Sequence, residues 1–290
     1  MAIQSLGQAF SWMAKTPLVW LSGVASAAIL MLGWYLYTTI GVMTAVSVVT
    51  VLLFVLPAFL AGTYGIISEN STSAALFGRY AVTGYFRCLL PILLTILIAW
   101  LIWQFVAYLL MAFGMNLMAS TQAAMFIFIP VIFFCYFADV TAVVNKLRMF
   151  QSIKDSFLRV MNGSIFTAVF YLINVMILLA SSFVASFIWT TLAADQLMPL
   201  VNMTETELLA ITPEEMLALF SEPGVIFATF VTLALCALIL VPLFTVYKAV
   251  YFKKTAPIQL PTREEFAAAT AAAAEQEGEY DEKGRWYKYK

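Results

Sequence analysis

The chain contains no histidine among its 290 residues. Histidine is the commonest general base near neutral pH and a frequent metal ligand. Its absence excludes active sites of the Ser-His, Cys-His and HExxH kinds. Cysteine is also rare: Cys88, Cys135 and Cys236 stand alone, without the CxxC spacing of a metal or redox site. We therefore expect no catalytic residue, no cofactor and no metal, and we expect the cysteines to be small apolar side chains.

Charged residues are scarce as well, at 11% of the chain, whereas 63% of the residues are hydrophobic. Soluble domains have about 25% charged residues and are roughly half apolar. So large an apolar excess cannot be buried in one water-soluble core, because a folded domain needs a polar surface. The net charge is −1, which gives no reason to expect nucleic acid as a partner.

The apolar residues form runs long enough to cross a bilayer, which needs about 20 helical residues per span. Each run must be helical, because an isolated strand leaves backbone groups unpaired in lipid. The fold class predicted is all-α: a polytopic integral membrane protein with six transmembrane helices. The expected spans are 18–38, 41–66, 89–113, 123–144, 166–192 and 225–250.

Local signals predict where helices break or begin. Proline removes a helical hydrogen bond and clashes with the preceding turn, so Pro57, Pro130 and Pro242 are expected to kink or break their spans. In the long connection 193–224, Thr204-x-x-Glu207 and Thr212-x-x-Glu215 are capping-box patterns, each of which predicts a short helix.

Lysine and arginine occur only before odd-numbered spans and at or after the ends of even-numbered ones. We call these the basic-side ends of the spans. The other connections contain neither residue, and 193–224 carries six carboxylates. The positive-inside rule then predicts a multi-pass protein of the cell membrane with both termini in the cytoplasm. We expect no signal peptide ahead of span 1, and we expect span 1 itself to act as the insertion signal.

Three short segments, 4–17, 75–86 and 151–164, precede the three pairs of spans. The apolar period of the first and third predicts cytoplasmic amphipathic helices on the membrane surface. In the third, Asp155 and Arg159 are expected on the polar face, opposite Phe157. One interpretation is three helix-span-span repeats, and the alternative is a chance likeness between hydrophobic segments. The repeats would cover 4–66, 75–144 and 152–250.

Segment 134–166 combines an aromatic residue and a carboxylate near the end of a span with a Ser-x-x-x-Ser-Phe pattern. The residues are Tyr136, Asp139, Ser152, Ser156 and Phe157. The segment resembles a stretch of archaeal and bacterial multi-pass families of unknown function. It is also similar to the membrane domain that accompanies some glycerophosphodiester phosphodiesterases. The resemblance covers spans 1 to 5 and implies an architecture without an activity, since the hydrolase domain is absent.

Asp139 is the one carboxylate that we predict inside a span, near the end of span 4, and Glu69 lies closer to water. Ionisable groups at membrane depth are costly and often functional, so both are candidate functional residues. The simpler interpretation is that Asp139 sits at the interface beside Asn145 and Lys146 and pairs there.

Residues 1–254 are predicted to form the membrane domain, and 255–290 a cytoplasmic tail with a helix from 262 to about 276. Residues 279–281 and 285–289 are predicted to pair as a small hairpin. An exposed aromatic and basic end needs a surface to rest on, either a protein partner or anionic lipid. Trp286, Tyr287 and Tyr289 are therefore candidate binding residues, and plain disorder is the alternative.

The preferred hypothesis is a non-enzymatic membrane protein, an interaction, assembly or lipid-organising component that acts through its surface helices and tail. The alternative is a secondary transporter or channel for an unidentified solute. It would depend on Asp139, but the sequence lacks the paired charges that usually mark a solute path. A membrane-embedded enzyme is disfavoured by the absence of histidine and of any carboxylate cluster within the spans.

Overall fold

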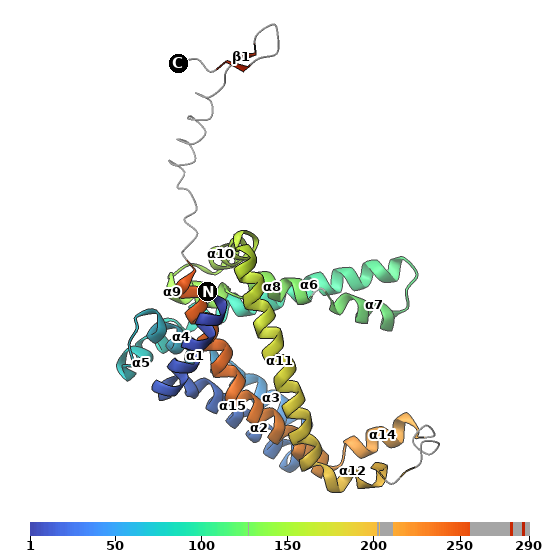
Figure 1. Cartoon of the computed structure of the whole chain (residues 1–290). Helices are drawn as coiled ribbons and strands as arrows, with labels where there is room; N and C mark the ends of the chain where they lie inside the picture. The colour runs from blue at the N-terminus through green and yellow to red at the C-terminus, as the bar shows by residue number, and fades with distance from the viewer. Residues whose placement is uncertain (127, 202, 204–210, 256–278, 281–285, 288–290) are drawn as a thin grey trace. The chain divides into compact units, whose positions relative to one another are not determined.

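The computed structural model describes residues 1–126, 128–201, 203, 211–255, 279–280 and 286–287. The chain divides into two compact units, Met1–Ala256 and Pro257–Lys290 (Figure 1). Within the described residues, six helical segments are long and apolar enough to cross a membrane. They are Pro17–Thr39, Val42–Ser68, Tyr85–Ala112, Leu117–Val144, Ile165–Leu192 and Pro223–Lys254. The six predicted spans are confirmed, and the largest shift is the start of span 4, at Leu117 in place of Ala123.

Spans 1, 3, 5 and 6 are built mainly from one helix each, whereas spans 2 and 4 are composite. Span 1 is the short 3-10 turn Pro17–Trp20 followed by α2 (Leu21–Thr39); α6 (Tyr85–Ala112), α11 (Ser164–Leu192) and α15 (Pro223–Lys254) form spans 3, 5 and 6. Span 2 is α3 (Val42–Leu53) and α4 (Leu56–Ser68), and span 4 is α7 (Leu117–Met125), α8 (Phe128–Cys135) and α9 (Ala138–Val144). The connecting helices are α1 (Ala2–Lys15), α5 (Ala74–Thr83), α10 (Met149–Asn162), α12 (Ala194–Val201) and α14 (Pro213–Phe220). In Figure 1, α2 runs along α15, and α7 lies beside α6.

The prolines act differently from one another. Span 2 breaks just before Pro57, and Pro130 lies in the first turn of α8, where a missing N–H costs no helical bond. In contrast, α15 continues through Pro242, so of the two expected effects, a kink or a break, the break does not occur there.

Pro242 leaves the carbonyl of Leu238 without its helical donor, and Gly23 of α2 packs against this site. A Cβ at Gly23 would overlap the Leu238 carbonyl oxygen and lie 2.8 Å from Cδ of Pro242. Glycine therefore permits the close approach of α2 to α15, as small residues do between membrane helices.

The hydrophobic core lies at the basic-side ends of the spans. Its buried members come from the start of spans 1, 3 and 5 and from the end of spans 2, 4 and 6, with α1, α5 and α10 packed around them. Large apolar side chains toward the other ends are exposed, among them Met43, Phe113, Phe183 and Phe187. Such side chains suit the hydrocarbon of a bilayer, where apolar exposure carries no penalty.

The three short helices before the span pairs are present, as α1, α5 and α10. In α10 the side with Asp155 and Arg159 is buried against the protein, whereas Phe157, on the opposite side as predicted, is exposed. The two charges neutralise each other: Nε of Arg159 donates to Oδ2 of Asp155 at 2.7 Å. The guanidinium also lies 4.2 Å from the ring centroid of Phe252. Equivalence of the three helices as repeats, and their place on a cytoplasmic surface, stay predictions.

One capping box of the long connection is confirmed at the start of α14. The backbone N–H of Thr212 donates to Oε2 of Glu215 at 2.9 Å, and the backbone N–H of Glu215 donates to Oγ1 of Thr212 at 3.3 Å. The pattern at Thr204 lies outside the described residues.

In the second unit, β1 (Glu279–Tyr280) and β2 (Trp286–Tyr287) pair antiparallel, with Glu279 opposite Tyr287 and Tyr280 opposite Trp286. This pairing is the hairpin that the sequence predicts. The predicted helix at 262–276 and Tyr289 lie outside the described residues.

Candidate functional site

Asp139 lies in the first turn of α9, is 6% exposed and makes contacts with two other spans. Nζ of Lys248 in α15 lies 2.6 Å from its Oδ1 and 2.8 Å from its Oδ2. The hydroxyl of Tyr64 in α4 donates to Oδ2 at 2.8 Å, and the backbone N–H of Val140 donates to Oδ1 at 2.8 Å. One carboxylate thus joins spans 2, 4 and 6.

The ammonium of Lys248 is enclosed by aromatic rings as well as by the carboxylate. It lies 4.5 Å from the ring centroid of Tyr136 and 5.8 Å from that of Tyr64, distances at which a ring face attracts a cation. A buried charge is tolerated when it is paired and hydrogen-bonded. The sequence suggested that Asp139 pairs beside Lys146, but in the structure its partner is Lys248, 109 residues away.

A hollow of about 130 Å³ lies beside this pair and is lined by both of its members and by residues of α6 and α8. The buried hydroxyl of Tyr247 has no hydrogen-bond partner within the described part of the chain. An open space next to a buried ion pair is a feature that a transport site would use, and the Tyr247 hydroxyl is an unsatisfied polar group on the same helix as Lys248.

Glu69, the second candidate carboxylate, belongs to a separate group of contacts at the end of α4. Its Oε1 accepts a hydrogen bond of 2.9 Å from the hydroxyl of Tyr80 in α5. Partial burial raises the pKa of the Tyr80 phenol, and the hydrogen bond to Glu69 raises it further. Nζ of Lys253 in α15 donates to the carbonyls of Ile67 and Ser68, at 3.0 and 2.8 Å. A cation is favourable at the C-terminal end of a helix. The Tyr80 and Lys253 contacts therefore connect the end of α4 to α5 and α15.

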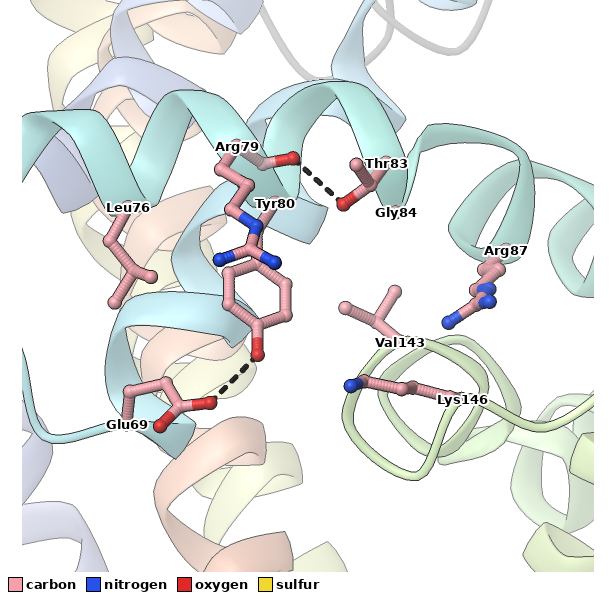
Figure 2. A pocket seen from close by; sticks show the side chains of 9 residues that line it. All are labelled: Glu69, Leu76, Arg79, Tyr80, Thr83, Gly84, Arg87, Val143 and Lys146. Carbon is pink, nitrogen blue, oxygen red and sulfur yellow. Dashed lines mark hydrogen bonds between the residues drawn. The ribbon is translucent and has the colours of Figure 1, made fainter.

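A larger hollow, of about 310 Å³, opens beside Glu69 between α4, α5, α6 and the end of α9. Figure 2 shows Arg79, Arg87 and Lys146 around it, with Val143 between them. All three cations are exposed, and none forms an ion pair with any residue that the structure describes. With Glu69 as the lining carboxylate, the hollow carries two net positive charges. We call it the basic pocket.

Close helix packing forms the back of the basic pocket. Gly84 joins α5 to α6, and a Cβ there would lie 2.6 Å from the carbonyl oxygen of Tyr80, 3.1 Å from Cβ of Ala61 and 3.4 Å from Cγ1 of Val143. Glycine thus lets the corner between α5 and α6 approach α4 and α9. From the sequence, Arg79, Arg87 and Lys146 indicate only the orientation of the spans, because nothing in their spacing shows that two loops meet.

No protein-family model, curated protein or solved structure matches this chain. The resemblance to multi-pass families and to a phosphodiesterase-associated membrane domain therefore stays a prediction. Among the described residues, no group of three or more His, Cys, Asp or Glu side chains is placed to hold a metal ion.

Proposed function

We propose that this chain is a non-enzymatic integral membrane component that works by binding lipid or a protein partner. It does so on the cytoplasmic face, through the basic-side ends of its spans and its tail. The observation that carries the proposal is the distribution of packing. The core and the contacts of Asp139, Glu69 and Arg159 gather at the basic-side ends, whereas the opposite ends present apolar surface.

Polar side chains along the spans also favour binding over transport. Oγ of Ser26 donates to the carbonyl of Ser22 at 2.8 Å, Oγ1 of Thr63 to that of Phe59 at 2.9 Å, and Oγ of Ser181 to that of Ile177 at 2.7 Å. Each hydroxyl is satisfied inside its own helix. A solute path needs polar groups that face a common cavity. Ser181 lines a hollow of about 230 Å³ between α11 and α15, but apart from Cys236 the other residues that line it are apolar.

A secondary transporter or channel is the second candidate, favoured by the hollow beside Asp139 and Lys248 and by the unpaired Tyr247 hydroxyl. In that case the pair would have to open during each cycle. The distances of 2.6 and 2.8 Å between Lys248 and Asp139 describe a closed contact, which suits a fixed connection between spans.

The two candidates are separated by purification of the full chain in mild detergent, followed by mass spectrometry of the lipids and proteins that it retains. A chain ending at Ala256, the boundary between the two units, tests the contribution of the tail. We expect selective retention of a lipid class or a protein. Preparations without selectivity, together with solute flux in vesicles that is abolished by Asp139→Asn, would contradict the binding function.

A further inference from the structure

Among the residues that the structure describes, Glu69 is the one carboxylate that lines the basic pocket, so its three cations are only partly neutralised. Arg79 lies in α5, Arg87 in the first turn of α6, and Lys146 just beyond α9. The lining carboxylate, Glu69, is already the acceptor for the Tyr80 hydroxyl. Like charges held around one hollow repel each other, and an anion bound between them would relieve that repulsion.

The chemistry of these side chains suits a phosphate group. The guanidinium of arginine presents a planar set of donors that binds phosphate oxygens in pairs, and the lysine ammonium adds a compact point charge. The other lining includes the apolar side chains of Leu76 and Val143. A phosphate there would be in contact with donors on several sides while its apolar attachment lay against carbon.

The net charge of the basic pocket distinguishes between phosphate ligands of different charge. Its two net positive charges are neutralised by a dianion, and a phosphomonoester carries about −1.5 to −2 at pH 7. A phosphodiester carries only one negative charge. We propose that the basic pocket binds a phosphomonoester, presented either by a membrane lipid headgroup or by a soluble phosphate compound. The inference rests on the proposed binding function, because it names the ligand class held at the basic-side ends.

The position of the pocket suits a headgroup. Glu69 follows the end of span 2, Arg87 begins span 3, and Lys146 follows span 4. Val82 and Phe86, which lie beside these residues on α5 and α6, are 78% and 65% exposed. Cations at the ends of spans, next to exposed apolar side chains, match the level of lipid phosphates.

The test uses the full chain in lipid nanodiscs of phosphatidylcholine with either phosphatidic acid, a monoester, or phosphatidylglycerol, a diester. A parallel titration of the detergent-purified protein with inorganic phosphate probes a soluble source. The pocket variant is Arg79→Gln/Arg87→Gln/Lys146→Gln. The matched control, Lys15→Gln/Lys154→Gln/Lys254→Gln, removes the same charge outside the pocket.

We expect the wild type and the control to enrich phosphatidic acid over phosphatidylglycerol, and the pocket variant to bind roughly tenfold more weakly or worse. The same loss with inorganic phosphate, without lipid enrichment, would assign the site to a soluble compound. Glu69→Gln keeps every cation and should tighten binding. A gain of binding cannot result from misfolding, so this variant tests the pocket even if the pocket variant fails to fold. Binding should weaken below pH 6, where the monoester loses its second charge.

Equal losses in the pocket and control variants would overturn the inference, because binding would then be a general effect of surface charge. Absence of binding to phosphatidic acid and to phosphate in the wild type would overturn it as well. Neither outcome contradicts the proposed binding of lipid or a protein partner if the wild type still retains another lipid or a protein selectively. That function fails only when nothing is retained selectively.

Discussion

The Asp139–Lys248 pair and the basic pocket both lie at the basic-side ends of the spans, and they differ in how their charges are neutralised. Asp139 and Lys248 are 6% and 8% exposed and bind each other directly. Arg79, Arg87 and Lys146 are exposed around a hollow, and the structure describes no ion pair for them.

The difference separates a structural contact from a binding site. A buried charge that loses its partner is left in a medium of low dielectric constant, which costs several kcal/mol per ion. The Asp139–Lys248 pair therefore resists opening. Exposed cations remain solvated without a partner, so the basic pocket can gain and lose an anion at little cost to the fold.

The largest expected effect comes from removal of one member of the buried pair. Lys248→Met leaves the Asp139 carboxylate without a cation and should destabilise the protein by roughly 3–5 kcal/mol. Asp139→Asn/Lys248→Met removes both charges and keeps an acceptor for Tyr64, so most of this loss should be absent. Thermal unfolding in detergent, followed by loss of helical circular dichroism, measures both. A single variant as stable as the wild type would show that the pair is not a structural contact.

A smaller effect is expected from a change in packing against α15, the helix that carries Lys248, without any change in charge. Gly23→Ala forces a methyl group against the Leu238 carbonyl and Pro242 of α15, which should cost about 1–3 kcal/mol, as overpacking does. Gly7→Ala in α1 is the matched control, because nothing lies within 4 Å of its added methyl group. The control should gain up to about 1 kcal/mol from helix propensity. Equal unfolding temperatures for the two variants would contradict the close approach of α2 to α15.

Loss of the three pocket cations should change stability far less than loss of Lys248. Each substitution of an exposed cation is expected to change the free energy of unfolding by no more than about 0.5 kcal/mol. At low salt the variant should be favoured, because the repulsion between the three cations is removed. The pocket variant, unfolded at low and high salt without added phosphate, tests this expectation. A loss comparable to that of Lys248→Met would show that these cations hold the fold together.

The smallest effect concerns Tyr80 at the edge of the basic pocket. Its folded pKa is raised by partial burial and then by Glu69. The stability that the neutral phenol contributes is thus present below its ordinary pKa of about 10 and is lost as pH rises through the higher folded value. An ultraviolet difference titration of wild type against Tyr80→Phe should show late ionisation, and Glu69→Gln should bring it earlier. Ionisation at or below the ordinary value would contradict the contact.

The spans could be predicted from the sequence because long apolar runs have few alternatives to crossing a bilayer. The partner of Asp139 could not, because Lys248 lies in another span and its pairing depends on how three helices pack. Burial of Asp155 and Arg159 could not be predicted for a related reason. A polar face at helical spacing suggests contact with water, and only the neighbouring Phe252 shows that the face is covered.

The basic pocket was the least predictable feature. Arg79 and Arg87 belong to one connection and Lys146 to another, and each serves equally well as an orientation signal. What brings them together is the close packing at Gly84, against Ala61 of α4 and Val143 of α9. One glycine in a single sequence does not reveal which helices approach it.

The most direct test of the account compares the lipids and proteins retained by Asp139→Asn/Lys248→Met with those retained by the pocket variant. Both are purified as full chains in mild detergent and identified by mass spectrometry. If the buried pair is structural and the basic pocket binds the ligand, the first variant keeps the wild-type set and the second loses its phosphomonoester component. The account would be contradicted if Asp139→Asn/Lys248→Met folded but lost the lipids and proteins that the wild type retains, while the pocket variant kept them.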